Sequence, residues 1–308
     1  MVDNFLMVSQ QVGVLFILIA VGFLCGKVKF INDNSAKKMT DIVLYIVTPC
    51  VMINAFQRDF DIKMLYNLGI TALCAFAIMI GSIILCSIIF RDKNIARNKV
   101  LKFGTVFSNC GFMSLPLQSA ILGQDGVFYG SVFVAVFNLL VWTYGLYFMS
   151  GSKKELSVKK LCLNHGILGV TAGVLLFLFS IKLPEIVASP VQYLANLNTP
   201  IPMLIIGFYL SQSNLKKVFA DKWAYLAMAV RLCVIPLVSL SLMYACGVRG
   251  DILVACIIAA SAPVAATTTM FATKFKADVE LSVGIVSATT LLSIATMPLV
   301  VSLATMIA

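Results

Sequence analysis

The sequence predicts an all-α integral membrane protein with ten transmembrane helices, and three observations support this fold class. Hydrophobic residues make up 60% of the 308-residue chain and charged residues only 12%, against roughly a quarter charged in soluble proteins. Apolar runs of about 20 residues, long enough to cross a hydrocarbon layer of about 30 Å as a helix, recur along the chain. The short apolar–polar alternation of a transmembrane β-barrel is missing from the sequence.

The ten spans can be placed between clusters of charge, glycine and proline. The first follows the residues MVDN, which lack the basic character of a cleavable signal peptide, so we predict that it is retained as a helix. The predicted spans are 5–25, 36–56, 64–90, 100–122, 127–149, 166–184, 188–211, 223–246, 251–273 and 281–306.

The basic residues gather in alternate loops between these spans. Eighteen of the 23 Lys and Arg residues lie in or beside the odd-numbered loops, and Arg231 lies inside a span. Because short cytoplasmic loops are enriched in Lys and Arg, we predict cytoplasmic odd loops and extracytoplasmic N- and C-termini in the cell membrane. The net charge of +10 therefore follows from topology and needs no nucleic-acid partner. The even-numbered loops hold Arg58, Lys63, Lys182 and Arg249.

Two short motifs recur in corresponding helices. TPCVM begins at Thr48 in the second span, and TPIPM begins at Thr199 in the seventh. SLP begins at Ser114 in the fourth span and is echoed by SAP from Ser261 in the ninth. The matches suggest two homologous halves of five spans, 1–150 and 151–308. An odd number of spans gives the halves opposite orientations, which is the inverted-repeat plan of secondary transporters.

The fourth span contains SNCGFMSLPL at 108–117, an unusual sequence for a continuous helix in lipid. We predict a helix break, in which Gly111 permits unusual backbone angles and Ser114 caps a new half-helix. Pro116 then falls in the first helical turn, where its missing N–H matters little. Such a break persists at membrane depth only where protein or a water-filled cavity surrounds it.

The ninth span repeats this scheme, with Ser261 as the predicted cap and Pro263 in the first turn. The hydroxyl groups of Thr267, Thr268 and Thr269 follow. If the two broken helices cross, two half-helix N-termini meet near the bilayer centre with free N–H groups and partial positive charge, which forms an anion site. The alternative is a pair of ordinary proline kinks in packed helices.

Two further polar residues lie deep in spans. Arg231 is interpreted either as a counter-ion for a carboxylate substrate or as a structural group that satisfies helix carbonyls or reaches the cytoplasmic surface. Asn54 either faces the substrate site or bonds between helices. Asp and Glu are absent from mid-span positions, which argues against a cation substrate and a carboxylate proton relay. Coupling to Na⁺ or H⁺ stays open.

Enzyme signatures are missing from the sequence. It contains no HExxH, GxSxG or glycine-rich phosphate loop, and its nine cysteines show no CxxC spacing. We therefore expect no enzyme, no cofactor and no metal site. An intramembrane enzyme and a non-transporting sensor are remote alternatives.

The motifs NCGFMSLPL and SAPVAATTTMFATKF, each in the fourth helix of a half, resemble those of the auxin efflux carrier family. The resemblance implies the bile-acid/sodium symporter fold, with broken helices 4 and 9 crossed at the substrate site. It also implies a core of helices 3–5 and 8–10 and a scaffold of helices 1, 2, 6 and 7. Where family members often carry Asn after the ninth-helix proline, this chain has Thr267. A homodimer through the scaffold is compatible with this plan.

The chain resembles the short bacterial members of the family, which include malate and malonate permeases. We therefore predict a secondary transporter of small organic anions that works by alternating access. The alternative is an exporter of auxin-like or other amphipathic weak acids. The predicted substrate-binding residues are Asn54, Asn109, Gly111, Ser114, Pro116, Arg231, Ser261, Pro263, Thr267 and Thr268.

Overall fold

The fold is built from helices. The computed structural model describes residues 2–156, 164–213 and 218–308, and within these ranges the only β-type pairing is one antiparallel bridge between Ser108 and Val264. The all-α class is confirmed. Seven of the described helices are long and apolar enough to cross a membrane. They are Phe5–Lys27, Asp33–Ala55, Ile62–Ile89, Cys110–Ser150, Glu185–Gln212, Lys222–Ala245 and Val279–Ile307.

The first half of the chain begins with one straight and one composite span. The straight span is α1, and the predicted second span consists of two helices joined by a π-helical turn, η1. Asn32 caps α2 by accepting a hydrogen bond from the Ser35 N–H, and Asp61 caps α4 in the same way through Lys63. The elements are α1 (Val2–Lys27), α2 (Asp33–Ile42), η1 (Val43–Val47), α3 (Thr48–Ala55) and α4 (Ile62–Ile89).

The predicted fourth span is divided. The helix α5 (Ile95–Val106) ends before an extended segment, after which the turn η2 (Cys110–Ser114) leads into α6 (Leu115–Leu140). Gly123 interrupts α6 with a left-handed φ of 62° and a ψ of −142°, angles that glycine adopts at little cost. This interruption lies where the sequence predicts the boundary between the fourth and fifth spans. The fifth span continues through η3 (Val141–Gly145) and α7 (Leu146–Ser150).

Prolines account for three of the π-helical turns. Pro49, Pro116 and Pro236 each follow such a turn within two residues of its end. A proline has no N–H to donate to the carbonyl four residues earlier, so the local hydrogen-bond pattern loosens from i→i+4 toward i→i+5. Proline spacing in the sequence therefore positions these turns.

The second half contains shorter pieces than predicted. The sixth span is a helix of 14 residues, the seventh is interrupted before Pro200, and the ninth is divided into α15 and α16. The elements are η4 (Lys153–Glu155), α9 (His165–Leu178), α10 (Glu185–Asn196), α11 (Pro200–Gln212), α13 (Lys222–Ala229), η5 (Val230–Val234), α14 (Ile235–Ala245), α15 (Gly250–Ser261), α16 (Thr267–Lys274) and α17 (Val279–Ile307).

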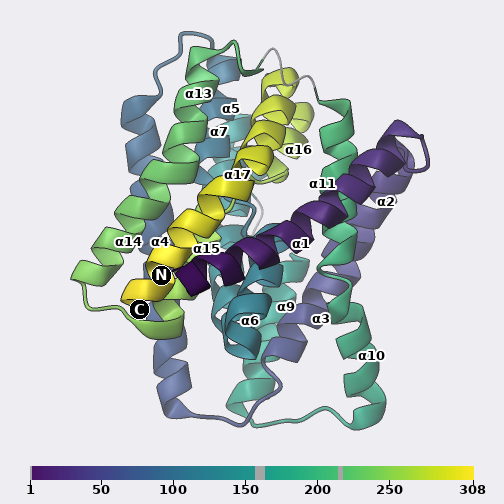
Figure 1. The fold of residues 1–308 in the computed structure, drawn as a ribbon, viewed down its shortest axis with the longest axis vertical. Helices are drawn as coiled ribbons and strands as arrows, with labels where there is room; N and C mark the ends of the chain where they lie inside the picture. The colour runs from purple at the N-terminus through teal and green to yellow at the C-terminus, as the bar shows by residue number, and fades with distance from the viewer. Residues whose placement is uncertain (1, 157–163, 214–217) are drawn as a thin grey trace.

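Glycines allow two helix pairs to pack closely. The helix α1 packs against α11, which it crosses in Figure 1, and a Cβ atom at Gly22 would stand 2.3 Å from the Leu204 carbonyl oxygen. A Cβ atom at Gly207 would stand 2.0 Å from the Ile19 carbonyl oxygen. The helix α9 packs on α3 in the same manner through Gly169. Small residues of this kind bring helix backbones together in membranes.

The helices form two groups that meet across α1 and α6. Figure 1 shows α4, α13 and α14 along one side of the molecule and α2, α3, α10 and α11 along the other. The helix α1 also packs against α17, and α6 packs against both α15 and α3. These contacts place α6 where the two groups adjoin.

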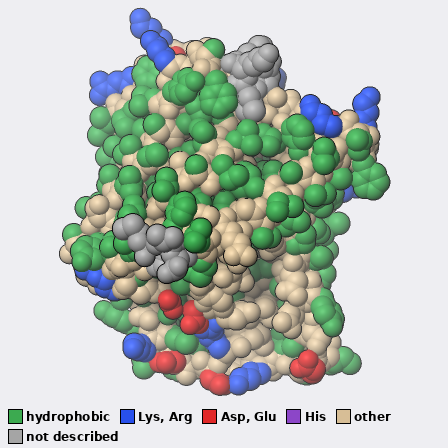
Figure 2. Space-filling model, in the orientation of Figure 1, with side chains coloured by type: hydrophobic (Ala, Val, Ile, Leu, Met, Phe, Trp, Pro, Cys, Tyr) green, Lys and Arg blue, Asp and Glu red, His purple; other side chains and the backbone are tan. Residues whose placement is uncertain are grey.

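The surface is that expected of a protein in lipid. Figure 2 shows hydrophobic side chains over the middle of one face, with Lys and Arg at its upper and lower ends. Side chains such as Ile186, Tyr193 and Ile17 are strongly exposed, which a hydrocarbon surrounding favours and water does not. Four of the basic residues counted in the odd loops, Lys159, Lys160, Lys216 and Lys217, lie outside the described residues.

Candidate functional site

The two broken helices cross at the centre of the fold, where their extended segments pair. The Asn109 N–H donates to the Pro263 carbonyl at 2.7 Å, and the Ala265 N–H donates to the Phe107 carbonyl at 2.9 Å. The Val264 N–H, next to them, donates to Thr289 Oγ1 at 3.2 Å. Each break thus satisfies backbone groups of the other, which is the condition for irregular backbone at membrane depth.

Arg231 supports the crossing from the side. Its side chain is 2% exposed, and Nη1 donates to the carbonyls of Thr105 and Val106, each at 3.1 Å. Nη2 donates to the Ala260 carbonyl. These three carbonyls belong to the last turns of α5 and α15, which have no helical N–H partners beyond the break. The observed contacts are those of the structural role proposed for Arg231.

The predicted capping scheme of the second break is wrong. Ser261 is the last residue of α15, and its hydroxyl donates to the Ile258 carbonyl within the same helix. Pro263 lies in the extended segment rather than in a first helical turn, and its carbonyl accepts the hydrogen bond from Asn109. The next helix starts only at Thr267. The bridge to the other broken helix outweighs the local preference of Ser-x-Pro for starting a helix.

The first break follows the prediction only in part. Pro116 lies in the first turn of α6, as predicted. Ser114 occupies the N-cap position without a side-chain capping bond, because the turn η2 already precedes it and its hydroxyl faces the Ile258 carbonyl at 3.4 Å. Gly111 lies inside η2 and has no positive φ, so the predicted unusual backbone angle is wrong.

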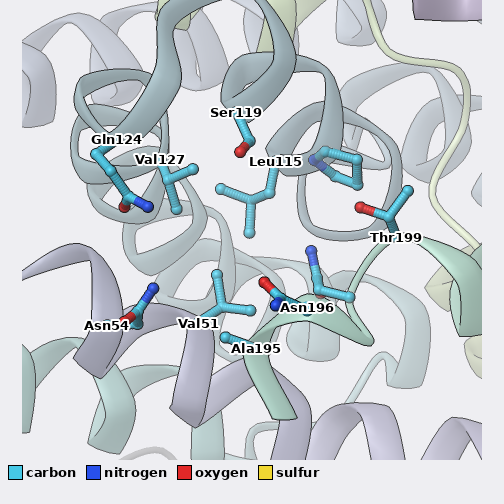
Figure 3. A pocket seen from close by; sticks show the side chains of 11 residues that line it. Val51, Asn54, Leu115, Ser119, Gln124, Val127, Ala195, Asn196 and Thr199 are labelled. Atoms are coloured by element: carbon cyan, nitrogen blue, oxygen red, sulfur yellow. The ribbon is translucent and has the colours of Figure 1, made fainter. Parts of the chain in front are cut away.

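A cavity of about 120 Å³ lies beside the first half of α6. Figure 3 shows Leu115, Ser119 and Gln124 of α6 on one side, opposite Asn54 of α3 and Asn196 at the end of α10. The walls thus come from α6 and from the helix group that contains α3 and α10. The complete lining is Val51, Asn54, Leu115, Pro116, Ser119, Gln124, Val127, Ala195, Asn196, Asn198 and Thr199.

Two of the ten predicted site residues, Asn54 and Pro116, line this cavity. Asn109, Gly111 and Ser114 occupy the bridge and the turn that lead into its α6 wall. The remaining five belong to the second break, to α16 or to the support of the crossing: Arg231, Ser261, Pro263, Thr267 and Thr268.

Sequence reasoning missed the polar residues on the opposite wall. Asn196, Asn198 and Thr199 form the polar stretch NLNT between the two apolar parts of the seventh span. That stretch was a usable signal, because carboxamides inside a span are rare. Gln118, also missed, is fully buried and donates from Nε2 to the Ala255 carbonyl at 2.8 Å, which fixes α6 on α15.

The cavity lining is polar but uncharged. It contains carboxamides and hydroxyls, and no Lys, Arg, His, Asp or Glu belongs to it. Leu115 and Pro116 at the start of α6 and Thr199, the N-cap of α11, also contribute, but they add few backbone donors, because η2 runs directly into α6 and Pro116, Pro200 and Pro202 have no N–H. The donors that a small anion meets in the cavity are therefore carboxamide N–H groups and hydroxyls, such as those of Asn54, Asn196 and Ser119. Among the described residues, no group of three or more His, Cys, Asp or Glu could hold a metal ion.

An ion pair lies next to the cavity. Arg58, four residues after Asn54, pairs with Asp125, the neighbour of Gln124, at 2.6 Å. The Arg58 guanidinium also lies 4.3 Å from the centre of the Phe128 ring and donates to the Ala55 carbonyl at 3.2 Å. The pair therefore connects the end of α3 to α6 beside the lining residues of both helices.

A second cluster of charged residues lies at the N-terminal end of α5. Arg97 pairs with Asp92 at 3.2 Å, with Asp221, and with Asp278 at 3.8 Å. Asp221 and Asp278 are the N-caps of α13 and α17, so three helices meet there. Burial raises the pKa of Asp221, but hydrogen bonds from Arg97 and from backbone N–H groups outweigh it and hold the pKa below its usual value.

A comparison with known protein families decides the class of the protein. Residues 7–301 match the family described as membrane transport protein. This chain belongs to that family. The expected relationship to auxin efflux carrier-like transporters is confirmed, and the protein is a multi-pass membrane transporter and not an enzyme.

Two relatives of this transporter come from archaea. It is 23% identical over 295 residues to an uncharacterized transporter of Methanocaldococcus jannaschii, covering 91% of this chain and 94% of the relative. It is 22% identical over 296 residues to an uncharacterized transporter of Methanothermobacter thermautotrophicus, covering 94% and 96%. The similarity extends over nearly the whole length of all three proteins.

Proposed function

We propose that this transporter is a secondary carrier of small organic anions of the malate or malonate type and works by alternating access. One observation carries the proposal: the cavity lies between α6 and the helix group that contains α3, α10 and α11, and carboxamides and hydroxyls line it. Carboxamide N–H and hydroxyl groups can donate to a carboxylate there. Movement of α6 against that group would expose the cavity to each side in turn.

The architecture we propose has ten spans in two inverted repeats, 1–150 and 151–308. Two features support it. The pairing of the first span with the seventh, α1 on α11, has its counterpart in the sixth span on the second, α9 on α3. The breaks before Cys110 and Thr267 occupy the fourth and ninth spans. The core comprises spans 3–5 and 8–10, and the scaffold comprises spans 1, 2, 6 and 7.

We place the carrier in the cell membrane with both termini extracytoplasmic. The support is the excess of Lys and Arg in the odd-numbered loops. Reporter fusions at residue 308 test the orientation. If only a reporter that works in the cytoplasm is active at residue 308, the C-terminus is cytoplasmic and the proposed orientation is wrong.

Uptake by proteoliposomes tests the proposed function. Purified protein is assayed with radiolabelled malate, malonate and an indole weak acid, under imposed Na⁺ or pH gradients. We expect uptake of the carboxylates above empty liposomes, and uptake of the indole acid alone would favour the auxin-like alternative. The gradients identify the coupling ion.

A pair of matched variants locates the site. Ser119→Phe fills the cavity and is expected to abolish uptake, whereas Ser87→Phe adds the same ring to an exposed position of α4 and is expected to leave uptake intact. Equal uptake by both variants would remove the cavity from the transport route.

A further inference from the structure

The turn that joins α1 to α2 exposes apolar side chains on a projecting part of the molecule. Phe30 is 81% exposed and Val28 is 73% exposed, and Figure 1 shows the turn projecting at the upper right. We refer to residues 27–32 as the α1–α2 tip. Exposed apolar surface of this kind is unfavourable in water, so the surroundings of the tip need an explanation.

Val28 continues a stripe of exposed apolar side chains on α1. The stripe consists of Val14, Ile17, Val21 and Leu24, at the helical spacings of three and four residues. Because α1 is long and apolar enough to cross a membrane, we expect the stripe to face lipid. The lipid that surrounds α1 therefore extends to the tip.

Hydrogen bonds hold the tip beside the last turn of α1. The N–H groups of Phe30 and Ile31 both donate to the Cys25 carbonyl, at 2.9 and 3.1 Å. Ile31 is buried in a small apolar cluster with Ala36 and Phe208. The ring of Phe30 is thus fixed close to the end of the apolar span, where the acyl chains of a bilayer give way to its headgroups.

Exposed lysines accompany these apolar side chains. Four lie in the tip or in the first two turns of α2, namely Lys27, Lys29, Lys37 and Lys38. In the part of the chain that the structure describes, none of the four forms an ion pair. Asp33 and Asp41 of α2 offset two of the charges and leave the region basic. Figure 2 shows basic side chains at the same corner of the molecule.

The backbone at Lys29 points to a use for its side chain. Lys29 has a left-handed conformation with a φ of 60°. Glycine adopts this conformation at little cost, whereas a residue with a Cβ atom is disfavoured there. Folding of the turn alone would therefore favour glycine, and the lysine adds a positive charge instead.

We infer that the α1–α2 tip is a membrane anchor that binds anionic phospholipid headgroups. Phe30 and Val28 would lie at the boundary between headgroups and acyl chains, and the lysines would pair with lipid phosphates. A phospholipid offers an apolar region and a negative charge side by side, whereas a soluble anion would leave the exposed apolar side chains in water. In the proposed orientation the tip faces the cytoplasmic leaflet, whose anionic lipids attract basic segments next to a span.

Fluorescence quenching by brominated lipids tests where the tip lies. Phe30→Trp is reconstituted into phosphatidylcholine with bromine near the top of its acyl chains, and the unmodified protein, with Trp142 and Trp223, gives the baseline. We expect the brominated lipid to quench the added fluorescence and acrylamide in the water to quench it little. The reverse pattern, or quenching by neither, would place the tip in water or under protein and overturn the inference.

The same reporter tests the preference for negative charge. Brominated phosphatidylglycerol is compared with brominated phosphatidylcholine, and we expect the phosphatidylglycerol to associate with the tip more strongly. Adding Lys29→Gln to the reporter should lower this preference about 5-fold, because each lysine near an anionic surface contributes a factor of about that size. High salt should lower it as well.

Lys63→Gln is the matched control. Lys63 is also an exposed lysine, but it lies at the start of α4 in an even-numbered loop, so its replacement should leave the preference unchanged. If the chosen variants fold poorly, Val28→Trp reports on the same tip, and Lys29→Gly removes the charge in a residue that suits the backbone.

Equal quenching by the two brominated lipids overturns the inference, as does a preference that Lys29→Gln leaves unchanged. An equal loss of preference in Lys63→Gln also overturns it, because the effect would then follow from net charge rather than from the tip. None of these measurements involves a transported substrate, so their outcomes leave the proposed function to its own tests.

Discussion

The two breaks at the centre of the fold share a backbone bridge but lead into different surroundings. The first is followed by η2 and by α6, whose opening residues Leu115 and Pro116 line the cavity. The second is followed by α16, a helix of eight residues, none of which belongs to the described cavity lining. There the hydroxyls of Thr267 and Thr268 are buried without a partner among the described residues.

This difference between the two breaks indicates how one pair of crossed helices can expose a substrate site to each side of the membrane in turn. The hydrogen bonds from Asn109 to Pro263 and from Ala265 to Phe107 join the two halves, and each break satisfies backbone groups of the other. The described cavity lies beside α6, and none of its lining residues comes from α16. We expect alternating access to exchange these conditions, so that the hydroxyls of α16 become available when the α6 side closes.

The largest expected effect comes from Arg231→Ala, which would break the crossing itself. The substitution leaves three buried carbonyls, those of Thr105, Val106 and Ala260, without their donor. Each buried acceptor left unsatisfied costs about 1–3 kcal/mol. We expect a strong loss of folded protein, measured by size-exclusion chromatography and thermal melting in detergent. Arg231→Lys is expected to be intermediate, since an ammonium cannot bridge carbonyls as a planar fork does.

The counter-ion hypothesis for Arg231 predicts instead that Arg231→Ala lowers substrate affinity and leaves the stability of the protein unchanged. If Arg231→Ala melts like the unmodified protein but loses affinity for a dicarboxylate more than for a monocarboxylate, Arg231 binds substrate. Equal affinity changes together with a lowered melting temperature support the structural role.

A moderate effect is expected from Asn109→Ala and Thr267→Ala, one on each side of the crossing. Loss of one hydrogen bond to substrate weakens binding by about 2- to 12-fold while expression stays near normal. Because Asn109 lies before the helix that lines the cavity and Thr267 begins α16, which does not line it, the two variants should differ when malate uptake is measured in proteoliposomes of each orientation. Wild-type rates in both variants would place the substrate site elsewhere.

A smaller effect is expected from the ion pair between Arg58 and Asp125, which ties α3 to α6 beside the cavity. Partly exposed pairs contribute about 0.2–1 kcal/mol, so Arg58→Ala should shift the balance between access states by about 1.5- to 5-fold. The measurement is the rate at which an impermeant maleimide labels Ser119→Cys, after replacement of the exposed Cys233 and Cys246.

The control for this pair is Lys182→Ala. Lys182 pairs with Asp59 at 2.9 Å, and both side chains are largely exposed, at 60% and 76%. That pair links the segments after α9 and α3, two helices that pack on each other, and labelling of Ser119→Cys should stay unchanged. An equal acceleration in both variants would show that the Arg58 pair has no special role.

The smallest effect concerns the distal ends of the broken helices. Asp221 pairs with Arg97 of α5, whereas Lys274 of α16 pairs with the partly exposed Glu155 at 3.8 Å. The folded-state pKa of Asp221 is lowered, so its stabilising contribution is present above the unfolded pKa, about 3.9, and is lost as the pH falls through the folded value. We expect Asp221→Asn to lower the melting temperature at pH 7.

The same comparison at lower pH checks the cause. The melting temperatures of Asp221→Asn and the unmodified protein should converge as the pH falls below about 4, where the carboxyl group becomes protonated. A difference that persists unchanged at low pH would assign the effect to packing or capping rather than to the charge.

The sequence by itself determined the class of the protein and the position of its breaks. The apolar runs require helices in lipid, and Gly111, Pro116 and Pro263 lie in or beside the segments that interrupt the fourth and ninth spans. Asn54, for which the sequence left two interpretations open, lines the cavity, since a carboxamide inside a span needs a polar neighbour. These are local properties, set by side-chain polarity and by the missing N–H of proline.

Only the tertiary structure decided what those residues contact. Ser261 and Pro263 suit a helix start by local preference, yet the chain stays extended there because the Phe107–Asn109 segment supplies hydrogen-bond partners from 150 or so residues away. Arg231 lies beside carbonyls of two other helices, which no spacing within its own span predicts. The cavity lining combines α3, α6 and the α10–α11 junction. Such contacts depend on how the helices pack, and packing joins residues that the sequence keeps far apart.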